Sequence, residues 1–172
     1  PAYLIELNGA LLFVADDGSV GRELRIVTQN HAPVLDNSGS MAFASINDNE
    51  TDNAGTLVSA VLSSAGGDRI TDADVGAREG IAVIAVDNAH GSWQYSTDGG
   101  TSWVSFSSPS ASSSRLLAAD GLTRVRFVPD GVFSGLVSEG ITFRAWDCTV
   151  GANGGTGNAS VGGGSAAFSA ET

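Results

Sequence analysis

The alternation of apolar runs and polar breaks is clearest in the middle of the chain. A β-branched, apolar run at residues 81–86 is followed by turn-forming residues at 87–91, and apolar side chains return at residues 93–95. A second polar break at residues 96–100 leads into a third short run at residues 103–106. Short runs rich in valine, isoleucine and aromatic residues, separated by Asn, Asp and Gly, predict consecutive antiparallel strands. We therefore expect a β-meander here.

Three more strand-like runs open the chain, at residues 3–7, 11–15 and 23–27. Asn8-Gly9 favours a two-residue hairpin turn between the first two runs, and Asp16-Asp17-Gly18 favours a looser turn before the third. We expect a β-hairpin or strand extension in this part of the chain. A single unit of this size cannot bury both of its faces, so it needs a partner surface.

The remaining strand candidates follow the N-terminal runs and the meander. Residues 41–46 alternate apolar with small side chains, residues 55–62 form another candidate, and residues 122–130 alternate apolar side chains with arginine. Residues 139–147 have one apolar side, whereas residues 151–164 are rich in Gly, Asn and Ser and predict a flexible loop. No window has a helical period, so the predicted fold class is all-β.

A domain boundary is expected at residues 29–39. Pro33 imposes an extended conformation on the residue before it and lacks an amide donor, as suits an edge strand. We therefore divide the chain into an N-terminal hairpin or strand extension, residues 1–29, and a β domain, residues 30–172. The length of 172 residues is sufficient for one domain with a core and an extension.

The second break of the meander and the residues that follow it, 96–103, read Ser-Thr-Asp-Gly-Gly-Thr-Ser-Trp. They resemble the Asp-box hairpin found in sialidases and many other extracellular β proteins. Asp98 can accept hydrogen bonds from turn amides, the glycines supply positive φ, and Trp103 can pack over the hairpin. We interpret this motif as structural, because a sialidase propeller would need several copies of it and a basic catalytic cluster.

The net charge of the chain limits the classes of function that are expected. The chain has 8 arginines, no lysine and 19 acidic residues, which gives a net charge of −11. A surface of this sign repels phosphate backbones and anionic lipids, so binding of nucleic acid or of a membrane surface is not expected. No run approaches the roughly 20 apolar residues that a membrane span needs. Thirteen of the acids are aspartates, many of them beside Gly or Asn in predicted turns.

Short carboxylates in turns can also bind a hard cation such as Ca²⁺. Asp72 and Asp74 lie two residues apart in a predicted loop, so both can point at one ion while backbone carbonyls complete its shell. Glu50 or Asp48 from an earlier loop and Asp147 after a later strand could add oxygens. Calcium is therefore a predicted cofactor. The alternative is a solvated acidic turn, because Asp is also a good turn residue.

Catalysis is not expected. The two histidines, His31 and His90, lie in a linker and a turn, and neither a nucleophile elbow nor a metalloprotease spacing is present. The single cysteine, Cys148, cannot form a disulfide within the chain. Two roles stay open for it, a small buried apolar residue or a link to another molecule.

Several short phrases resemble one family. The sequences NHAPVL (30–35), ITDADVG (70–76), RFVPDGVFSG (126–135) and ITFRAWD (141–147) are similar to phrases of bacterial cadherin-like repeats. The likeness covers about residues 32–172. It implies an antiparallel Greek-key β-sandwich of about seven strands, used in tandem in large extracellular surface adhesins. The N-terminal phrase LNGALLFVADDGSVGREL resembles one unit of a bacterial surface repeat.

In that family a last strand follows the phrase found here at residues 167–172. A sandwich without that strand exposes unpaired amides and an apolar groove, which favours addition of another segment. We predict that the N-terminal arm of the same chain or of another subunit fills this place, through Tyr3, Leu4, Ile5, Glu6 and Leu7. The alternative is a chain boundary placed slightly early.

The expected function is therefore a non-catalytic structural and adhesive module at the cell surface. Its partners would be further copies or neighbouring modules of the same protein, and calcium would stiffen it. A different class is a carbohydrate-binding module for surface glycans. It requires that aromatic rings share an exposed face for stacking on sugars. The candidates are Trp93, Tyr95 and Trp146; packing in the core is the alternative role for each ring.

Overall fold

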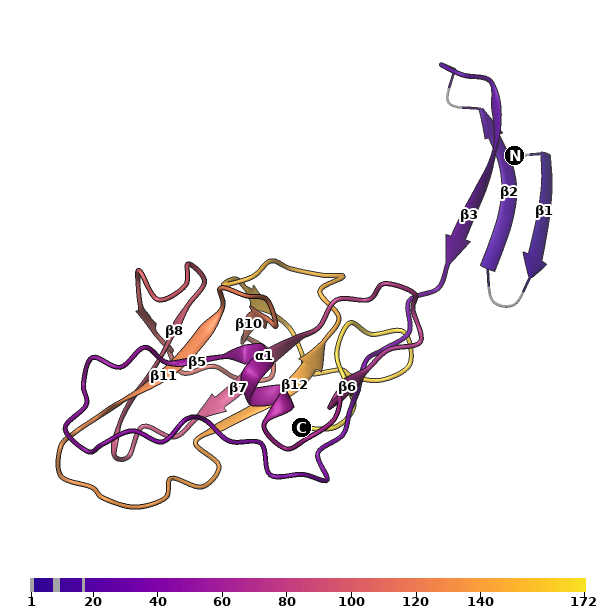
Figure 1. The fold of residues 1–172 in the computed structure, drawn as a ribbon. Coiled ribbons are helices and arrows are strands. Elements are labelled where there is room, and N and C mark those ends of the chain that lie inside the picture. Colours follow the sequence, from indigo (N-terminus) through magenta and orange to yellow (C-terminus); the bar gives the residue numbers. More distant parts are fainter. Residues whose placement is uncertain (1, 8–9, 17) are drawn as a thin grey trace. The chain divides into compact units, whose positions relative to one another are not determined.

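A computed structural model describes residues 2–7, 10–16 and 18–172 of the chain (Figure 1). The chain divides into two compact units, Pro1–Asn30 and His31–Thr172, and the division falls one residue from the expected boundary. Antiparallel strands make up most of the regular structure in both units. The predicted all-β class is confirmed.

The N-terminal unit is a three-stranded antiparallel sheet with the order β1-β2-β3. Strand β1 (Ala2–Leu7) pairs with β2 (Ala10–Asp16), which pairs with β3 (Arg22–Thr28). All three predicted strands are present, each one or two residues longer than expected. The Asn8-Gly9 turn and Asp17 lie outside the described residues.

The second unit contains two four-stranded antiparallel sheets and one two-stranded sheet. The first four-stranded sheet has the order β12-β7-β10-β13, and the second has the order β5-β11-β8-β9. Strands β4 and β6 form the small sheet. The bounds are β4 (Val34–Leu35), β5 (Thr56–Leu57), β6 (Ile70–Thr71), β7 (Gly80–Val86), β8 (Gly91–Ser96), β9 (Val104–Ser105), β10 (Ser114–Ala118), β11 (Arg124–Pro129), β12 (Ile141–Trp146) and β13 (Thr156–Gly157).

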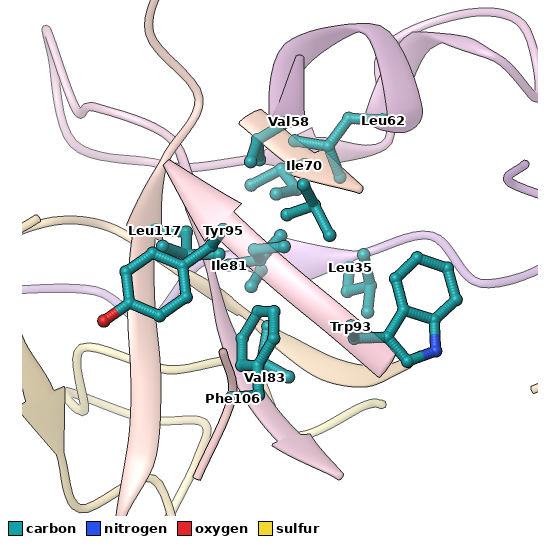
Figure 2. Close-up of a cluster of buried hydrophobic side chains, with 12 residues drawn as sticks. Leu35, Val58, Leu62, Ile70, Ile81, Val83, Trp93, Tyr95, Phe106 and Leu117 are labelled. Atoms are coloured by element: carbon teal, nitrogen blue, oxygen red, sulfur yellow. The ribbon is translucent and has the colours of Figure 1, made fainter. Parts of the chain in front are cut away.

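The main core lies between the two four-stranded sheets, as in a β-sandwich. Ile81 and Val83 of β7 and Leu117 of β10 meet Trp93 and Tyr95 of β8 in one buried cluster (Figure 2). Alternation along each strand sends every second side chain into this layer. The prediction of a central meander is right for β8 and β9, which pair with each other, but wrong for β7, because the break at residues 87–91 carries the chain from the first sheet to the second. Trp93 and Tyr95 of β8 are core residues.

The first sheet is also covered on its outer face. Ala82 of β7 and Trp146 of β12 are buried there against Ala159, Ala167 and Phe168 near the end of the chain. Burial on both faces explains why β7 reads as a continuous apolar run rather than an alternating one.

The predicted loop at residues 151–164 is mostly without regular structure, but it contains one short strand and packs on the first sheet. This segment contributes β13 to the sheet. The Leu116 amide of β10 donates to the Gly155 carbonyl at 3.0 Å, and the Gly154 amide donates to the Leu116 carbonyl at 2.8 Å. Ala159 is completely buried. Glycine and small residues here allow the backbone to lie close to the sheet. Gly157 shows this, because a Cβ atom at its position would lie 3.1 Å from the Leu116 side chain.

The prediction of a strand at residues 55–62 is also wrong beyond its first residues. Strand β5 ends at Leu57, and helix α1 (Val58–Ser63) follows directly. Val58, Val61 and Leu62 are the buried residues of this helix. Their i, i+3, i+4 spacing places them on one helical face, a period that a strand would not produce.

The hairpin at residues 96–103 has the expected Asp-box structure. Asp98 accepts hydrogen bonds from the Ser96 hydroxyl at 2.7 Å and from the Ser102 amide at 2.9 Å, and Gly99 and Gly100 have positive φ. The Ser102 hydroxyl donates to the other carboxylate oxygen of Asp98 at 2.5 Å. The Arg126 guanidinium lies over the Trp103 ring at 4.2 Å. The motif is a structural hairpin.

These hydrogen bonds, those of Ser102 above all, hold the pKa of Asp98 well below its usual value. Because the pKa is lowered in the folded state, the ionised carboxylate stabilises the fold at pH values above its ordinary pKa near 4. This contribution is lost as the pH falls below that value. We expect Asp98→Asn to lower the melting temperature at neutral pH and to differ less from the wild type in acid. Asp48→Asn, the same charge change in another loop, is the control for thermal unfolding across pH. A deficit that stays constant with pH would contradict this assignment.

The outer layer of the first sheet can be tested with Phe168, which is 4% exposed. Removing a buried aromatic side chain leaves a cavity, so Phe168→Ala is expected to lower the free energy of unfolding by about 3–5 kcal/mol. The control, Val161→Ala, removes a side chain of the same segment that is 71% exposed, and its effect should stay within about 0.5 kcal/mol. Denaturant unfolding measures both. A mild effect at Phe168 would mean that the segment does not pack on the sheet in solution.

Candidate functional site

A groove of about 1180 Å³ lies in the second unit. Residues 39–48 and residues 133–143 are among those that line it. Trp93 and Phe127 are among the lining residues, and their rings lie 4.9 Å apart at a tilted angle. The walls therefore combine apolar rings with backbone from two long irregular segments.

Strand β12 ends the first sheet, and its first three residues, Ile141 to Phe143, line this groove. β7 pairs with one edge of β12 along its length. Within the described residues, the other edge has one bridge, between Trp146 and Phe168, supported by a hydrogen bond from the Ser169 amide to the Ala145 carbonyl at 3.0 Å. The C-terminal segment thus accompanies only the last part of β12.

The unpaired part of this edge can be located by alternation along β12. The Ala145 amide points away from β7, because it donates to the Ser169 hydroxyl at 2.9 Å. Alternate residues of a strand direct their amides and carbonyls to the same edge. Ile141 and Phe143 therefore direct theirs away from β7, as Ala145 does. An edge of this kind can pair with a further strand.

The groove is also lined by residues 41–46, which were predicted to alternate as a strand does. Met41, Phe43 and Ile46 are half-buried, but no strand assignment covers this segment. Its Ala42 and Ala44 amides donate instead to the hydroxyls of Ser64 at 2.8 Å and Thr56 at 3.1 Å. A strand-like sequence without a strand partner therefore lines the same groove as β12.

The residues 133–140 form the rim of the groove next to β12. Leu136 is 88% exposed there, an unusual environment for a large apolar side chain. Phe133 stacks on His90 with ring centroids 3.8 Å apart, which fixes the start of this segment. The sequence contains no signal that would identify Leu136 beforehand, because one apolar residue in a loop is ordinary.

Asp72 and Asp74 line a smaller pocket of about 270 Å³ after β6, together with Asp68 and Glu79. Asp72 accepts a hydrogen bond from the Asp74 amide at 2.8 Å through Oδ1, whereas its Oδ2 is buried without a hydrogen-bond partner. Burial and the charge of Asp68 raise the pKa of Glu79. Arg78 lines the same pocket, so four acidic side chains face one guanidinium there and the local charge is negative.

His31 already forms hydrogen bonds with the Asp74 carboxylate. Its amide donates to Oδ2 and its Nδ1 contacts Oδ1, both at 2.8 Å. These hydrogen bonds hold the pKa of Asp74 below its ordinary value. The contact anchors the first residue of the second unit to the loop after β6, and a cation at Asp74 would have to displace it.

The other predicted calcium ligands lie elsewhere. Glu50 accepts hydrogen bonds from Asn47, and both Glu50 and Asp48 line the large groove. Asp147 is 3% exposed and accepts hydrogen bonds from the Thr149 amide and hydroxyl at 2.8 and 2.6 Å. Across residues 2–7, 10–16 and 18–172, no three His, Cys, Asp or Glu side chains are grouped so that they could hold a metal ion. The residues thus offer part of a calcium shell, and calcium binding stays a prediction.

The three predicted sugar-stacking residues are buried. Trp93, Tyr95 and Trp146 are 5%, 6% and 2% exposed, so they present no shared face to solvent. The Trp93 indole donates to the Asp87 carbonyl at 3.0 Å, and the Trp146 indole donates to the Val150 carbonyl at 2.9 Å. These rings therefore pack in the core, which is the alternative role considered for them.

Cys148 lies two residues after the end of β12 and has a positive φ of 63°. Its thiol is half-buried and contacts the Glu79 carbonyl at 3.6 Å. Burial raises the pKa of the Cys148 thiol to about 11, so the reactive thiolate is scarce at neutral pH. This environment favours a packing role over a link to another molecule.

The predicted donor segment lies in the N-terminal unit, where β1 pairs with β2. Tyr3, Leu4, Ile5, Glu6 and Leu7 are all exposed, and the register with β2 shifts between Ala2 and Leu4. As an outer strand with one neighbour, β1 is held by fewer hydrogen bonds than β2. Donation of β1 to another surface would require its release from β2.

Known proteins provide no further constraint. No family model matches the chain, and neither the curated proteins nor the solved structures include a match. The likeness to cadherin-like repeats therefore stays a prediction that rests on short phrases. Among the described residues, no helix has the length and apolar character needed to cross a membrane.

The calcium prediction can be tested at the loop after β6. Ca²⁺ bound by Asp72 and Asp74 would displace His31, so titration is expected to shift the His31 ring resonances in NMR spectra. His90, stacked on Phe133, is the internal control and should not respond. Asp72→Asn should remove the His31 response. Equal shifts at both histidines, or none at His31, would contradict calcium binding here.

Proposed function

We propose that the chain is a non-catalytic structural and adhesive module of an extracellular assembly, which associates with other chains by accepting a β-strand beside β12. The observation that carries the proposal is the unpaired edge at Ile141 and Phe143 beside a large, partly apolar groove. The extracellular location rests on the resemblance of short phrases to surface adhesins.

The chemistry of the groove suits an extended peptide. An added strand would pair with the amide and carbonyl groups of β12, while its alternate side chains would enter the space lined by Phe43, Trp93 and Phe127. Main-chain hydrogen bonds give such contacts affinity, and the side-chain pockets give them specificity. Residues 41–46, which line the same groove, would contact the incoming strand.

Residues 3–7 of another copy remain the proposed donor. Ile5 and Leu7 project on one side of β1, with Glu6 on the other, so one side of the donated strand is apolar and suits the apolar rings that line the groove. Addition of this strand is head-to-tail, because donor and acceptor are different surfaces. Contacts of that kind can continue from chain to chain and produce linear assemblies.

Leu136 and Val132 form a matched pair for testing this proposal. Both are 88% exposed, but only Leu136 is among the groove-lining residues. A carboxylate at the rim would be desolvated by an incoming apolar strand, so Leu136→Asp is expected to weaken association about tenfold, equal to roughly 1.4 kcal/mol. Val132→Asp should leave it unchanged.

Light scattering over a range of protein concentrations measures the effect. Both variants add one negative charge, so general repulsion acts equally on them. Equal weakening by Leu136→Asp and Val132→Asp would show that charge alone, and not the groove, controls association. Unchanged association in Leu136→Asp would contradict strand addition at this site.

A further inference from the structure

The N-terminal sheet has two chemically different faces. Residues that pair directly across antiparallel strands share a face, and neighbours along a strand point to opposite faces. The pairs Ile5–Leu12, Leu12–Ile26 and Val14–Leu24 therefore belong to one face. Its large apolar side chains are Ile5, Leu7, Leu12, Val14, Leu24 and Ile26.

The charged side chains of the three strands lie mainly on the opposite face. Glu6 pairs with Leu11, Glu23 pairs with Ala15, and Arg25 pairs with Phe13, all in the alternate rows. Arg25 and Glu23 form an ion pair of 2.6 Å there. On the apolar face, charge occurs only at the end of the sheet, where Asp16 pairs with Arg22.

The apolar face is exposed to a degree that a stable fold rarely shows. Ile5, Leu7, Leu24 and Ile26 are between 58% and 63% exposed. A single three-stranded sheet has no second layer, so it cannot bury this face within itself. A contiguous apolar patch of this kind marks a contact surface for another protein.

We propose that this face packs against the same face of a second copy of the chain. Two twisted sheets with identical apolar faces match in shape and form the two layers of a small β-sandwich. The exposed large apolar residues of the second unit do not offer such a partner, because they come from separate loops and short strands, such as Val75, Leu122 and Val161.

Charge also favours contact between N-terminal units. Residues 1–30 contain four acidic residues and two arginines, a net charge of −2. Residues 31–172 contain fifteen acidic residues and six arginines, a net charge of −9. Two copies therefore repel one another least where their N-terminal sheets meet, and salt screens the remaining repulsion.

The size of the face predicts reversible dimers. Three strands of six or seven residues give a flat footprint of roughly 300 Å², before the relief of the side chains is added. Two such faces give roughly 600 Å² of flat area, below the lower limit of about 1,200 Å² that specific interfaces bury in total, so the contact is expected to be weak and reversible. Because the same face is used twice, the contact closes at two copies.

Ile26 and Val27 provide neighbouring test positions on β3. They are 60% and 53% exposed and point to opposite faces of the sheet. Ile26→Lys places a charge in the proposed contact and is expected to weaken dimer formation at least about tenfold, whereas Val27→Lys leaves it unchanged. Leu24→Lys, on the same face as Ile26, should repeat the effect and guards against a local folding defect in one variant.

Sedimentation velocity of the full chain, at low and high salt, measures the dimer. The wild type should dimerise with increasing concentration and more strongly in high salt. A wild type that stays monomeric, or equal effects of Ile26→Lys and Val27→Lys, would overturn the proposal.

Leu136→Asp separates this contact from strand addition, because it should stop growth beyond the dimer but keep the dimer. Loss of dimers in Leu136→Asp together with their survival in Ile26→Lys would also overturn the face-to-face contact. The two modes compete for β1, since a donated β1 would remove Ile5 and Leu7 from the apolar face.

Discussion

The structure of the second unit depends on burial of both faces of β7. Ile81 and Val83 pack against the second sheet, while Ala82 packs under Trp146 and Phe168 on the opposite side. A strand buried on both faces must have neighbours on both edges, and β12 and β10 fill these places. β12 consequently becomes the end of the sheet, with its outer edge beside the groove. The proposed acceptor site is therefore a consequence of how the core is built.

The two units solve the problem of burial in different ways. The second unit covers its first sheet with another sheet and with the C-terminal segment, and its buried aromatic rings are part of that packing. The N-terminal unit has a single layer whose apolar face has no cover from its own strands. Association through that face and association through the β12 edge are two uses of the same principle, because each completes a layer that one copy leaves incomplete.

Much of the strand arrangement could be predicted from local sequence. The three N-terminal strands, β7, β8 and β12 have period-two or continuous apolar patterns, and the Asp box at residues 96–103 specifies its own hydrogen bonds. The local pattern did not show that β7 and β8 belong to different sheets. Helix α1 was missed because six residues are too short for periodicity to separate helix from strand. The packing of residues 151–164 on the sheet was missed because glycine content signals turns and loops, whereas here glycine also permits close approach to the sheet. The groove depends on residues 39–48 and 133–143 meeting in space, which no local pattern specifies.

Amide hydrogen exchange at Phe143 tests the central claim most directly, because that amide lies on the unpaired edge of β12. In a dilute, monomeric sample we predict fast exchange at Phe143 and slow exchange at Thr142, whose amide faces β7. At concentrations where chains associate, Phe143 should become protected while Thr142 stays unchanged. Protection of Phe143 in the monomer, or its continued fast exchange in the assembled state, would contradict the account of β12 as a strand acceptor.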